Sequence, residues 1–186
     1  HSPHIYGASF WSVLKGLWYA HIGWMFSTDP PDHRYIPDLK KDPDLVWLNT
    51  TWFFWSVVGI IVPGIIGGLV TQSLYGAFLG LLWGGFVRVF LAHHVTWSIN
   101  SICHTFGTQP YRTGDHSKNN ALCGILGLGE GWHNNHHAFP SSARHGLEWW
   151  QPDLSWMMIW TLEKLGLVWD VYTPSAKQKQ NKTPST

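Results

Sequence analysis

The sequence turns strongly apolar at WFFWSVVGIIVPGIIGGLV, Trp52–Val70, and again at LYGAFLGLLWGGFVRVFLA, Leu74–Ala92. No charged residue lies between Asp44 and Arg88. Each run has about the 20 residues that a helix needs to cross the roughly 30 Å hydrocarbon core of a bilayer. Because only three residues separate the runs, we expect a tight antiparallel transmembrane hairpin. Two buried helices of a soluble core are the alternative, and the long uncharged gap argues against them.

Basic residues flank this hairpin and are missing from its turn. In chain order they are Arg34, Lys40, Lys41, Arg112, Lys118 and Arg144. The positive-inside rule therefore predicts that both flanks are cytoplasmic and that the turn lies outside. Arg88, near the inner end of the second run, is expected to extend its charged group toward the interface.

The segments outside the hairpin also predict helices and loops. FWSVLKGLWYAHIGWM, Phe10–Met25, repeats aromatic residues at helical spacing, which predicts an amphipathic helix lying in the membrane interface. Residues 172–186 are polar without an apolar period, which predicts a disordered tail. The expected fold is therefore all-α and membrane-bound: one hairpin, one interfacial helix and a cytoplasmic helical cap. The formal net charge of +1 gives no argument for a nucleic acid partner.

Three histidines stand close together in GEGWHNNHHAFP, Gly129–Pro140. His133, His136 and His137 have the i, i+3, i+4 spacing that places side chains on one face of a helix. Three imidazoles on one face are costly to bury without a purpose, and metal ligation is the usual purpose.

A second polar set follows the second apolar run, in AHHVTWSINSICH, Ala92–His104. Asn100 and His104 are four residues apart and share a helix face. The His-Glu-x-x-His string of zinc peptidases does not occur in the chain. Carboxylate di-iron bundles need four glutamates, and this chain has only Glu130, Glu148 and Glu163. A histidine-rich iron site at a membrane surface is left.

These motifs carry a family resemblance. GEGWHNNHHAFPSSARHGLEWWQPD resembles the third histidine box of the membrane fatty acid desaturases, in their delta-9 acyl-CoA and acyl-lipid branch. HVTWSINSICHTFG, His94–Gly107, is similar to the segment after that family's last membrane helix. HSPH and HIGWMF are similar to the stretch after its second box. The similarity covers residues 1–171 almost completely and is greatest to the cyanobacterial and plant members.

The resemblance implies a fatty acid desaturase that uses O2 and a two-iron centre to introduce a cis double bond, at the delta-9 position, into a saturated acyl chain. It implies, as iron ligands, His104, His133, His136 and His137, with Asn100 acting through a water. The residues implied to orient these ligands or cap their helix are Glu130, Asn134 and Asn135. The resemblance implies that His94 lies behind the ligands and is not one of them. The proposed walls of a substrate tunnel are Trp97, Trp132, Trp149 and Trp150. His145 lies outside the matched pattern and is expected away from the histidine cluster.

The implied partners are membrane lipid, an acyl-CoA or acyl-lipid substrate, O2 and a separate electron donor. A separate donor is expected because the chain has no flavin or haem motif. The resemblance to the cyanobacterial members implies a ferredoxin, with cytochrome b5 as the alternative. The histidine region, 93–150, is expected on the cytoplasmic face of a cyanobacterial plasma or thylakoid membrane.

The family's two earlier histidine boxes have no counterpart here, because only His1 and His4 precede the amphipathic segment. We therefore expect the chain to be the C-terminal portion of a desaturase and to be inactive alone. A non-catalytic truncated membrane protein and a related di-iron hydroxylase are the alternatives.

Overall fold

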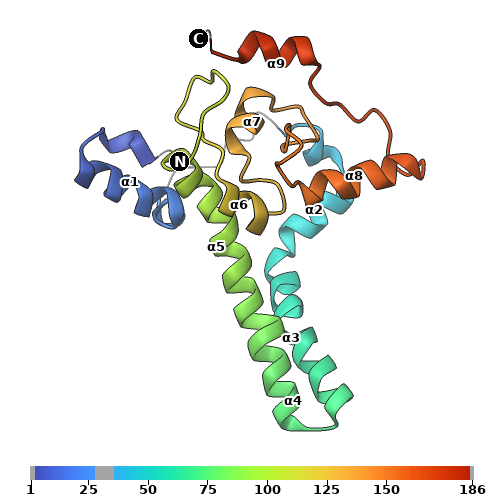
Figure 1. Ribbon diagram of the computed structural model, residues 1–186. Coiled ribbons are helices and arrows are strands. Elements are labelled where there is room, and N and C mark those ends of the chain that lie inside the picture. The colour runs from blue at the N-terminus through green and yellow to red at the C-terminus, as the bar shows by residue number, and fades with distance from the viewer. Residues whose placement is uncertain (1–2, 28–35, 185–186) are drawn as a thin grey trace. The chain divides into compact units, whose positions relative to one another are not determined.

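The computed structural model describes residues 3–27 and 36–184, and within these ranges every regular element is a helix (Figure 1). The α-helices are α1 (Phe10–His21), α2 (Pro43–Thr50), α3 (Trp52–Thr71), α4 (Leu74–Leu79), α5 (Arg88–Ser101), α6 (Ala121–Leu126), α7 (His133–Ala138), α8 (Leu154–Lys164) and α9 (Ala176–Lys182). The 3-10 turns are η1 (Pro3–Tyr6), η2 (Gly23–Phe26), η4 (Leu39–Lys41) and η6 (Ile102–His104), and η5 (Gly80–Val87) is a π-helix. The predicted all-α fold is confirmed.

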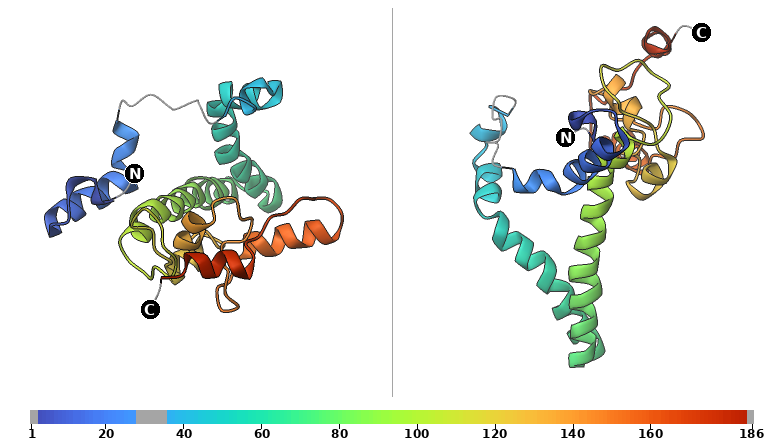
Figure 2. Two further views of the ribbon diagram at one scale, coloured as in Figure 1. Left: turned by 90° about the horizontal axis from the view of Figure 1, so that it is seen from above. Right: turned by 90° about the vertical axis from the view of Figure 1, so that its left-hand side faces the viewer.

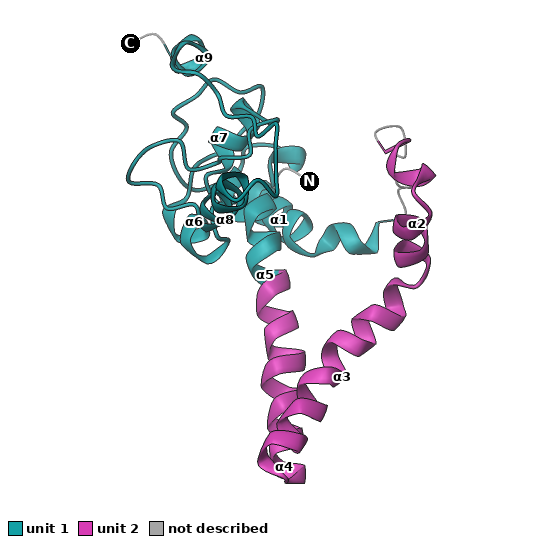
Figure 3. Ribbon diagram, turned by 90° about the vertical axis from the view of Figure 1, so that its right-hand side faces the viewer, with its two compact units in different colours: residues 1–27, 94–186 teal, residues 28–93 magenta. Residues whose placement is uncertain are grey.

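The chain divides into two compact units, shown in two colours in Figure 3. One unit consists of residues 28–93 and contains the hairpin. The other consists of residues 1–27 and 94–186 and contains α7 with its histidines. Arg34, one of the basic residues used for the predicted orientation, lies outside the described residues.

Two helices are long and apolar enough to cross a membrane: Trp52–Thr71, and a helix that continues without interruption from Leu74 to His104. In the most apolar stretch of each helix, only 6% of the first helix and 11% of the second is buried within the chain. A helix at the centre of a soluble protein would be mostly buried, so this exposure favours lipid-facing helices. The predicted second run, Leu74–Ala92, is thus the first part of a longer helix that also carries Asn100 and His104.

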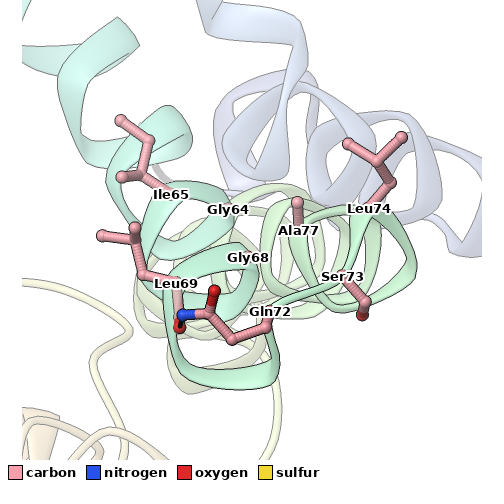
Figure 4. A pocket seen from close by; sticks show the side chains of 8 residues that line it. All are labelled: Gly64, Ile65, Gly68, Leu69, Gln72, Ser73, Leu74 and Ala77. Carbon is pink, nitrogen blue, oxygen red and sulfur yellow. Dashed lines mark hydrogen bonds between the residues drawn. The ribbon is translucent and has the colours of Figure 1, made fainter.

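Glycines allow the two helices of the hairpin to pack closely near their shared turn, as the right-hand view of Figure 2 shows. A Cβ added at Gly67 would lie 2.4 Å from the carbonyl oxygen of Gly76, and one at Gly80 would lie 2.2 Å from that of Pro63. Figure 4 shows a shallow pocket beside this turn, with small residues at the contact: Gly64, Gly68 and Ala77. A larger side chain at Gly67 or Gly80 would therefore force the helices apart.

Arg88 is held by the hairpin's own backbone. Its Nε donates to the carbonyl oxygen of Gly84 at 2.6 Å, and its Nη2 donates across the hairpin to that of Gly59 at 2.8 Å. A guanidinium in apolar surroundings needs such acceptors, because no bulk water replaces them there. The structure thus shows a link between the helices where the sequence predicted a side chain extended to the interface.

The predicted amphipathic helix over Phe10–Met25 is present as α1 followed by η2. The Ser9 hydroxyl accepts a hydrogen bond from the backbone N–H of Ser12 at 3.2 Å and caps the start of α1. Its exposed aromatic residues include Trp11, at 75% exposure, and Trp18, at 56%. This uncovered apolar face is the pattern of a helix that lies on a membrane surface.

The C-terminal residues correct the prediction of a disordered tail at 172–186, because α9 lies within them. Ser175 and Gln178 form a capping box, in which each side chain accepts a hydrogen bond from the other's backbone N–H. Lys182 Nζ donates to the carbonyl oxygen of Ala138 at 2.6 Å, and its own carbonyl accepts from the backbone N–H of Arg112 at 2.7 Å. The prediction considered only the missing apolar period, whereas caps and polar contacts fix this helix.

Candidate metal centre

The start of the histidine helix α7 is fixed by Trp132. The indole is buried, at 2% exposure, and its Nε1 donates to the carbonyl oxygen of Pro152 at 2.8 Å. The ring packs on Gly124 of α6, where a Cβ would lie 2.9 Å from the indole. Trp132 thus joins α6 and the loop before α8 to the first turn of α7, which begins at His133.

Two buried asparagines anchor α7 to the loops around it. Asn134 exchanges two hydrogen bonds with the backbone of Tyr111, at 2.9 and 3.1 Å. Asn135 accepts from Asn119 Nδ2 at 2.7 Å and donates to the carbonyl oxygen of His145 at 2.7 Å. Both asparagines therefore position α7. Neither caps it, since α7 has no side-chain cap hydrogen bond.

Three histidines converge beside α7. The ring nitrogens of His104, His133 and His137 that could hold a metal all lie within 4.8 Å of one another. The Nε2 atoms of His104 and His133 are 3.0 Å apart. His104 comes from η6 at the end of the long helix, so the two sequence motifs that predicted a metal site meet in the structure.

Asp115 joins this cluster, although the histidine spacing gave no signal for it. Its Oδ2 accepts a hydrogen bond from Nδ1 of His137, and its Oδ1 accepts from the Ser117 backbone and the Thr113 hydroxyl, both at 2.9 Å. Burial alone would raise the pKa of the Asp115 carboxyl, but these hydrogen bonds hold that pKa well below its usual range. The ionised carboxylate can only accept, so Nδ1 of His137 carries a proton and Nε2 is the only ring nitrogen that could bind a metal.

A pocket of about 320 Å³ adjoins the three-histidine cluster. Its lining consists of Thr96, Ile99, Asn100, Glu130, His133, His136 and His145. The ring centroids of His136 and His145 are 4.6 Å apart. The expectation that His145 lies away from the histidines is therefore wrong, because the loop after α7 folds back beside it. His133 contributes to both the cluster and the pocket.

Burial favours the neutral form of His133 and His136. Desolvation, followed by the nearby His137, lowers the pKa of His133 to about 3. Desolvation, followed by the nearby His145, lowers that of His136 to about 4. Nδ1 of His104 and Nδ1 of His136 are buried and find no hydrogen-bond partner within the part of the chain that the structure describes. Neutral, converging imidazoles with unpaired nitrogens fit a transition metal such as iron.

A comparison with known families agrees with this geometry. A family model described as "Fatty acid desaturase" matches residues 2–173, which is most of the chain. The chain belongs to this family. The all-α fold and the histidine cluster are therefore features of a member of the fatty acid desaturase family, and the family generally uses a di-iron centre.

Curated relatives of this desaturase chain come from bacteria and plants. The hex-5-enoyl-[acyl-carrier protein] acetylenase of Moorena producens is 46% identical over 97% of this chain and 57% of its own length. The chloroplastic palmitoyl-monogalactosyldiacylglycerol delta-7 desaturase of Arabidopsis thaliana is 42% identical over 91% of this chain and 44% of its own. The sn-1 stearoyl-lipid 9-desaturase of Anabaena variabilis is 40% identical over 88% and 58%. The chain thus spans about half the length of the curated relatives it matches.

The remaining predicted site residues of the desaturase chain are dispersed. His94 pairs with His21, with Nδ1 and Nε2 2.9 Å apart, and the ring of Trp97 contacts both histidines. Trp132 and Trp150 contact each other edge to face at 5.7 Å, whereas Trp149 is 92% exposed. No single wall of the predicted tunnel therefore contains all four tryptophans. Glu130 lies at the pocket and is not a helix cap.

Proposed function

We propose that the chain contributes to the iron centre of an O2-dependent fatty acid desaturase, with His104, His133, His136 and His137 as ligands and Asn100 acting through a water. The convergence of three ligand nitrogens within 4.8 Å supports this most directly. Two irons bound there would supply the O2-derived oxidising power that removes hydrogen from unactivated CH2 groups, which no side-chain acid or base can do.

The residues of this chain hold and orient that centre. Neutral imidazoles present lone pairs to a metal without first losing protons. The carboxylate of Asp115 fixes the tautomer of His137, so that Nε2 is the nitrogen available to a metal. Asn134 and Asn135 keep α7 in register with the loops that carry Asp115 and His145. These contacts restrict the movement of the proposed ligands, which favours a fixed coordination geometry.

The proposed reaction removes two hydrogens from adjacent carbons of a saturated acyl chain and forms a cis double bond at the delta-9 position. The 40% identity to a stearoyl-lipid 9-desaturase supports this position. The acyl group is carried by a lipid or by CoA, and electrons come from a ferredoxin-type donor, with cytochrome b5 as the alternative. Iron as the metal, O2 as the oxidant and the identity of the electron donor are all parts of this proposal.

An acetylenase is a second candidate, because the chain is 46% identical to an acetylenase that is named for an acyl-carrier-protein substrate. The same removal of two hydrogens, applied to an existing double bond, would yield a triple bond. The two candidate reactions differ in their product, and the same metal site would serve either of them.

The test is to express the chain, together with any sequence that flanks it naturally, in a host that lacks its own desaturase. Gas chromatography with mass spectrometry of derivatised lipids would locate new double or triple bonds. We expect a delta-9 monoene and its complete loss in His137→Ala. His116→Ala is the matched control, because His116 is exposed and lies outside the cluster and the pocket. Hydroxylated products, or activity that survives His137→Ala, would disprove the proposal.

We also propose that the hairpin spans a cyanobacterial plasma or thylakoid membrane with the histidines on the cytoplasmic side. Leu74→Cys tests this orientation, because Leu74 is 92% exposed beside the turn. Ser73 is left intact because its hydroxyl caps α4 by accepting from the Gly76 N–H at 3.0 Å. The native thiols, Cys103 and Cys123, are buried. An impermeant maleimide should label Leu74→Cys only from the non-cytoplasmic side, and labelling only from the cytoplasm would reverse the topology.

A further inference from the structure

We propose that Cys103 and Cys123 form a redox-sensitive pair of thiols, which a peroxide converts into a disulfide beside the histidine cluster. They are the only two cysteines of the chain. Cys103 lies in η6 and Cys123 lies in α6, and both side chains belong to one buried cluster with Ile99. A hydrogen bond joins the two thiols. Two cysteines from separate segments thus meet side chain to side chain.

The backbone around both cysteines is held in place. The carbonyl oxygen of Cys103 accepts from the Lys118 N–H at 2.6 Å, and the N–H of Cys123 donates to the Asn120 side chain at 3.1 Å. Gly131 lies against both cysteines. Sγ of Cys103 is 3.9 Å from its carbonyl oxygen, and a Cβ added at Gly131 would lie 2.7 Å from Cβ of Cys123. A side chain at this position would therefore push α6 away from η6.

The thiol of Cys123 reacts first in the proposed oxidation. A hydrogen bond from the Cys103 thiol lowers the pKa of the Cys123 thiol, whereas burial opposes this change. The thiolate of Cys123 attacks one oxygen of hydrogen peroxide, the O–O bond breaks, and Cys123 becomes a sulfenic acid. The sulfur of Cys103 then attacks the sulfenic sulfur, and the S–S bond forms as water leaves. In total the two thiols lose two electrons and two protons, and one hydrogen peroxide is reduced to two waters.

Two inert thiols that only fill the core are the competing explanation, because Cys103 is 0% and Cys123 5% exposed. The pocket beside α7 gives a small oxidant a route to them, since Ile99 both lines this pocket and packs in the cysteine cluster. Hydrogen peroxide is nearly as small as water and needs only a brief movement of Ile99. A bulky maleimide is excluded, so the folded chain should react with peroxide and not with maleimide at these positions.

The disulfide would act on the histidine cluster through His104. Cys103 directly precedes His104, whose Nε2 lies 3.0 Å from Nε2 of His133. A covalent bond holds two sulfurs closer together than a hydrogen bond does, so η6 and α6 would shift toward each other and move the ring of His104. We therefore expect the oxidised chain to bind metal more weakly. This consequence rests on the proposed metal-dependent function, whereas formation of the disulfide does not.

The first test is treatment of the purified whole chain in detergent with a small molar excess of hydrogen peroxide, followed by unfolding, maleimide alkylation and mass spectrometry. The untreated chain should take up two maleimides and the treated chain none, with recovery after dithiothreitol. A digest made without reductant should contain Cys103 linked to Cys123. Cys123→Ala is the matched control, and its remaining thiol should still be alkylated after the same treatment.

A titration with Co²⁺, followed by visible absorption, measures the effect on the histidine cluster. The oxidised wild type should bind Co²⁺ about tenfold more weakly than the reduced wild type, as is typical when the support of a ligand is disturbed. Peroxide should leave the Co²⁺ affinity of Cys123→Ala unchanged, because this variant cannot form the disulfide.

The outcomes separate this inference from the proposed function. Two free thiols after peroxide treatment, or a disulfide between two copies of the chain, would overturn the pair. A disulfide that leaves the Co²⁺ affinity unchanged would overturn its action on His104. A chain that forms the disulfide but binds no Co²⁺ in either state would overturn the proposed metal-dependent function and retain the pair.

Discussion

The Nε2 atoms of His104 and His133 lie 3.0 Å apart, although 29 residues separate them in the chain. Both side chains are buried, at 8% and 6% exposure. At this separation at most one of the two nitrogens carries a proton, because two N–H groups cannot face each other at hydrogen-bond distance. A cation can take the place of that proton. The pair is thus the point at which the end of the long helix and the start of α7 would be joined by a metal.

The stability of the metal-free chain should depend on pH through its buried histidines. Burial lowers the pKa of His133 to about 3 and that of His136 to about 4, from an ordinary value of 6.5. Between pH 6.5 and about 4 the unfolded chain therefore binds more protons than the folded chain, and the free energy of unfolding falls as the pH falls. Above pH 6.5 both states are neutral and this dependence ends.

Thermal unfolding in detergent, followed by near-ultraviolet circular dichroism, measures this effect. The midpoint should decrease from pH 6.5 toward pH 4, and His136→Gln should show a smaller decrease because it removes one of the titrating groups. An unchanged midpoint across this window would contradict the burial of the histidines.

Replacing the carboxylate that orients His137 should weaken metal binding. Asp115→Asn preserves the size of the side chain but removes the charge that fixes the Nδ1 proton of His137. We expect a fall in Co²⁺ affinity of about 10–100-fold. Asp170→Asn is the matched control, since Asp170 is exposed. Equal affinities in the two variants would show that Asp115 has no part in orienting the ligand.

The contact between the tail and α7 should protect the histidine helix. Lys182→Met keeps most of the aliphatic stem and removes the ammonium, which donates to Ala138 and lies over the ring of Phe139. We expect a loss of about 1 kcal/mol in local stability, because one charge-assisted hydrogen bond is removed at a partly exposed position. Hydrogen exchange should therefore accelerate at the amides of α7. Lys177→Met, at an exposed position of α9, should leave their exchange unchanged.

Close packing of the hairpin should be sensitive to one methyl group. In Gly67→Ala the new Cβ would lie 2.4 Å from the carbonyl oxygen of Gly76, so the helices have to separate. We expect a cost of about 1–3 kcal/mol, which is typical of overpacking. Gly59→Ala lies in the same helix, and its nearest neighbour, Nη2 of Arg88, is 3.9 Å away. Thermal midpoints in detergent that fall equally in both variants would argue against the close approach.

The hairpin could be predicted because the amino-acid composition of a long stretch of the sequence indicates it. Residues 45–87 carry no charge, and the structure has two helices there that could cross a membrane. The spacing of His133, His136 and His137 likewise predicts local neighbours, because a helix relates residues three and four apart. His104 could be added because the family resemblance indicated it.

The rest of the candidate site depends on how loops fold, and spacing has no rule for that. Asp115 lies 22 residues before His137 and reaches it only because the loop between η6 and α6 returns to α7. His145 follows α7 closely, but its position beside His136 depends on Asp153 and Asn135, which hold its backbone. The docking of α9 through Lys182 could not be predicted either, since polar contacts leave no periodic pattern in a sequence.

The position of α9 also determines how such a chain is best handled in the laboratory. Because the ammonium of Lys182 reaches Ala138, the residue after His137, a peptide attached at the end of α9 would begin close to the histidine cluster. A polyhistidine purification tag at that end would bring additional imidazoles close to the native ones and compete for the same ions. Metal counts from such a preparation would describe the tag as much as the protein. A spin label or fluorophore at the same end would instead be a sensitive reporter of metal uptake.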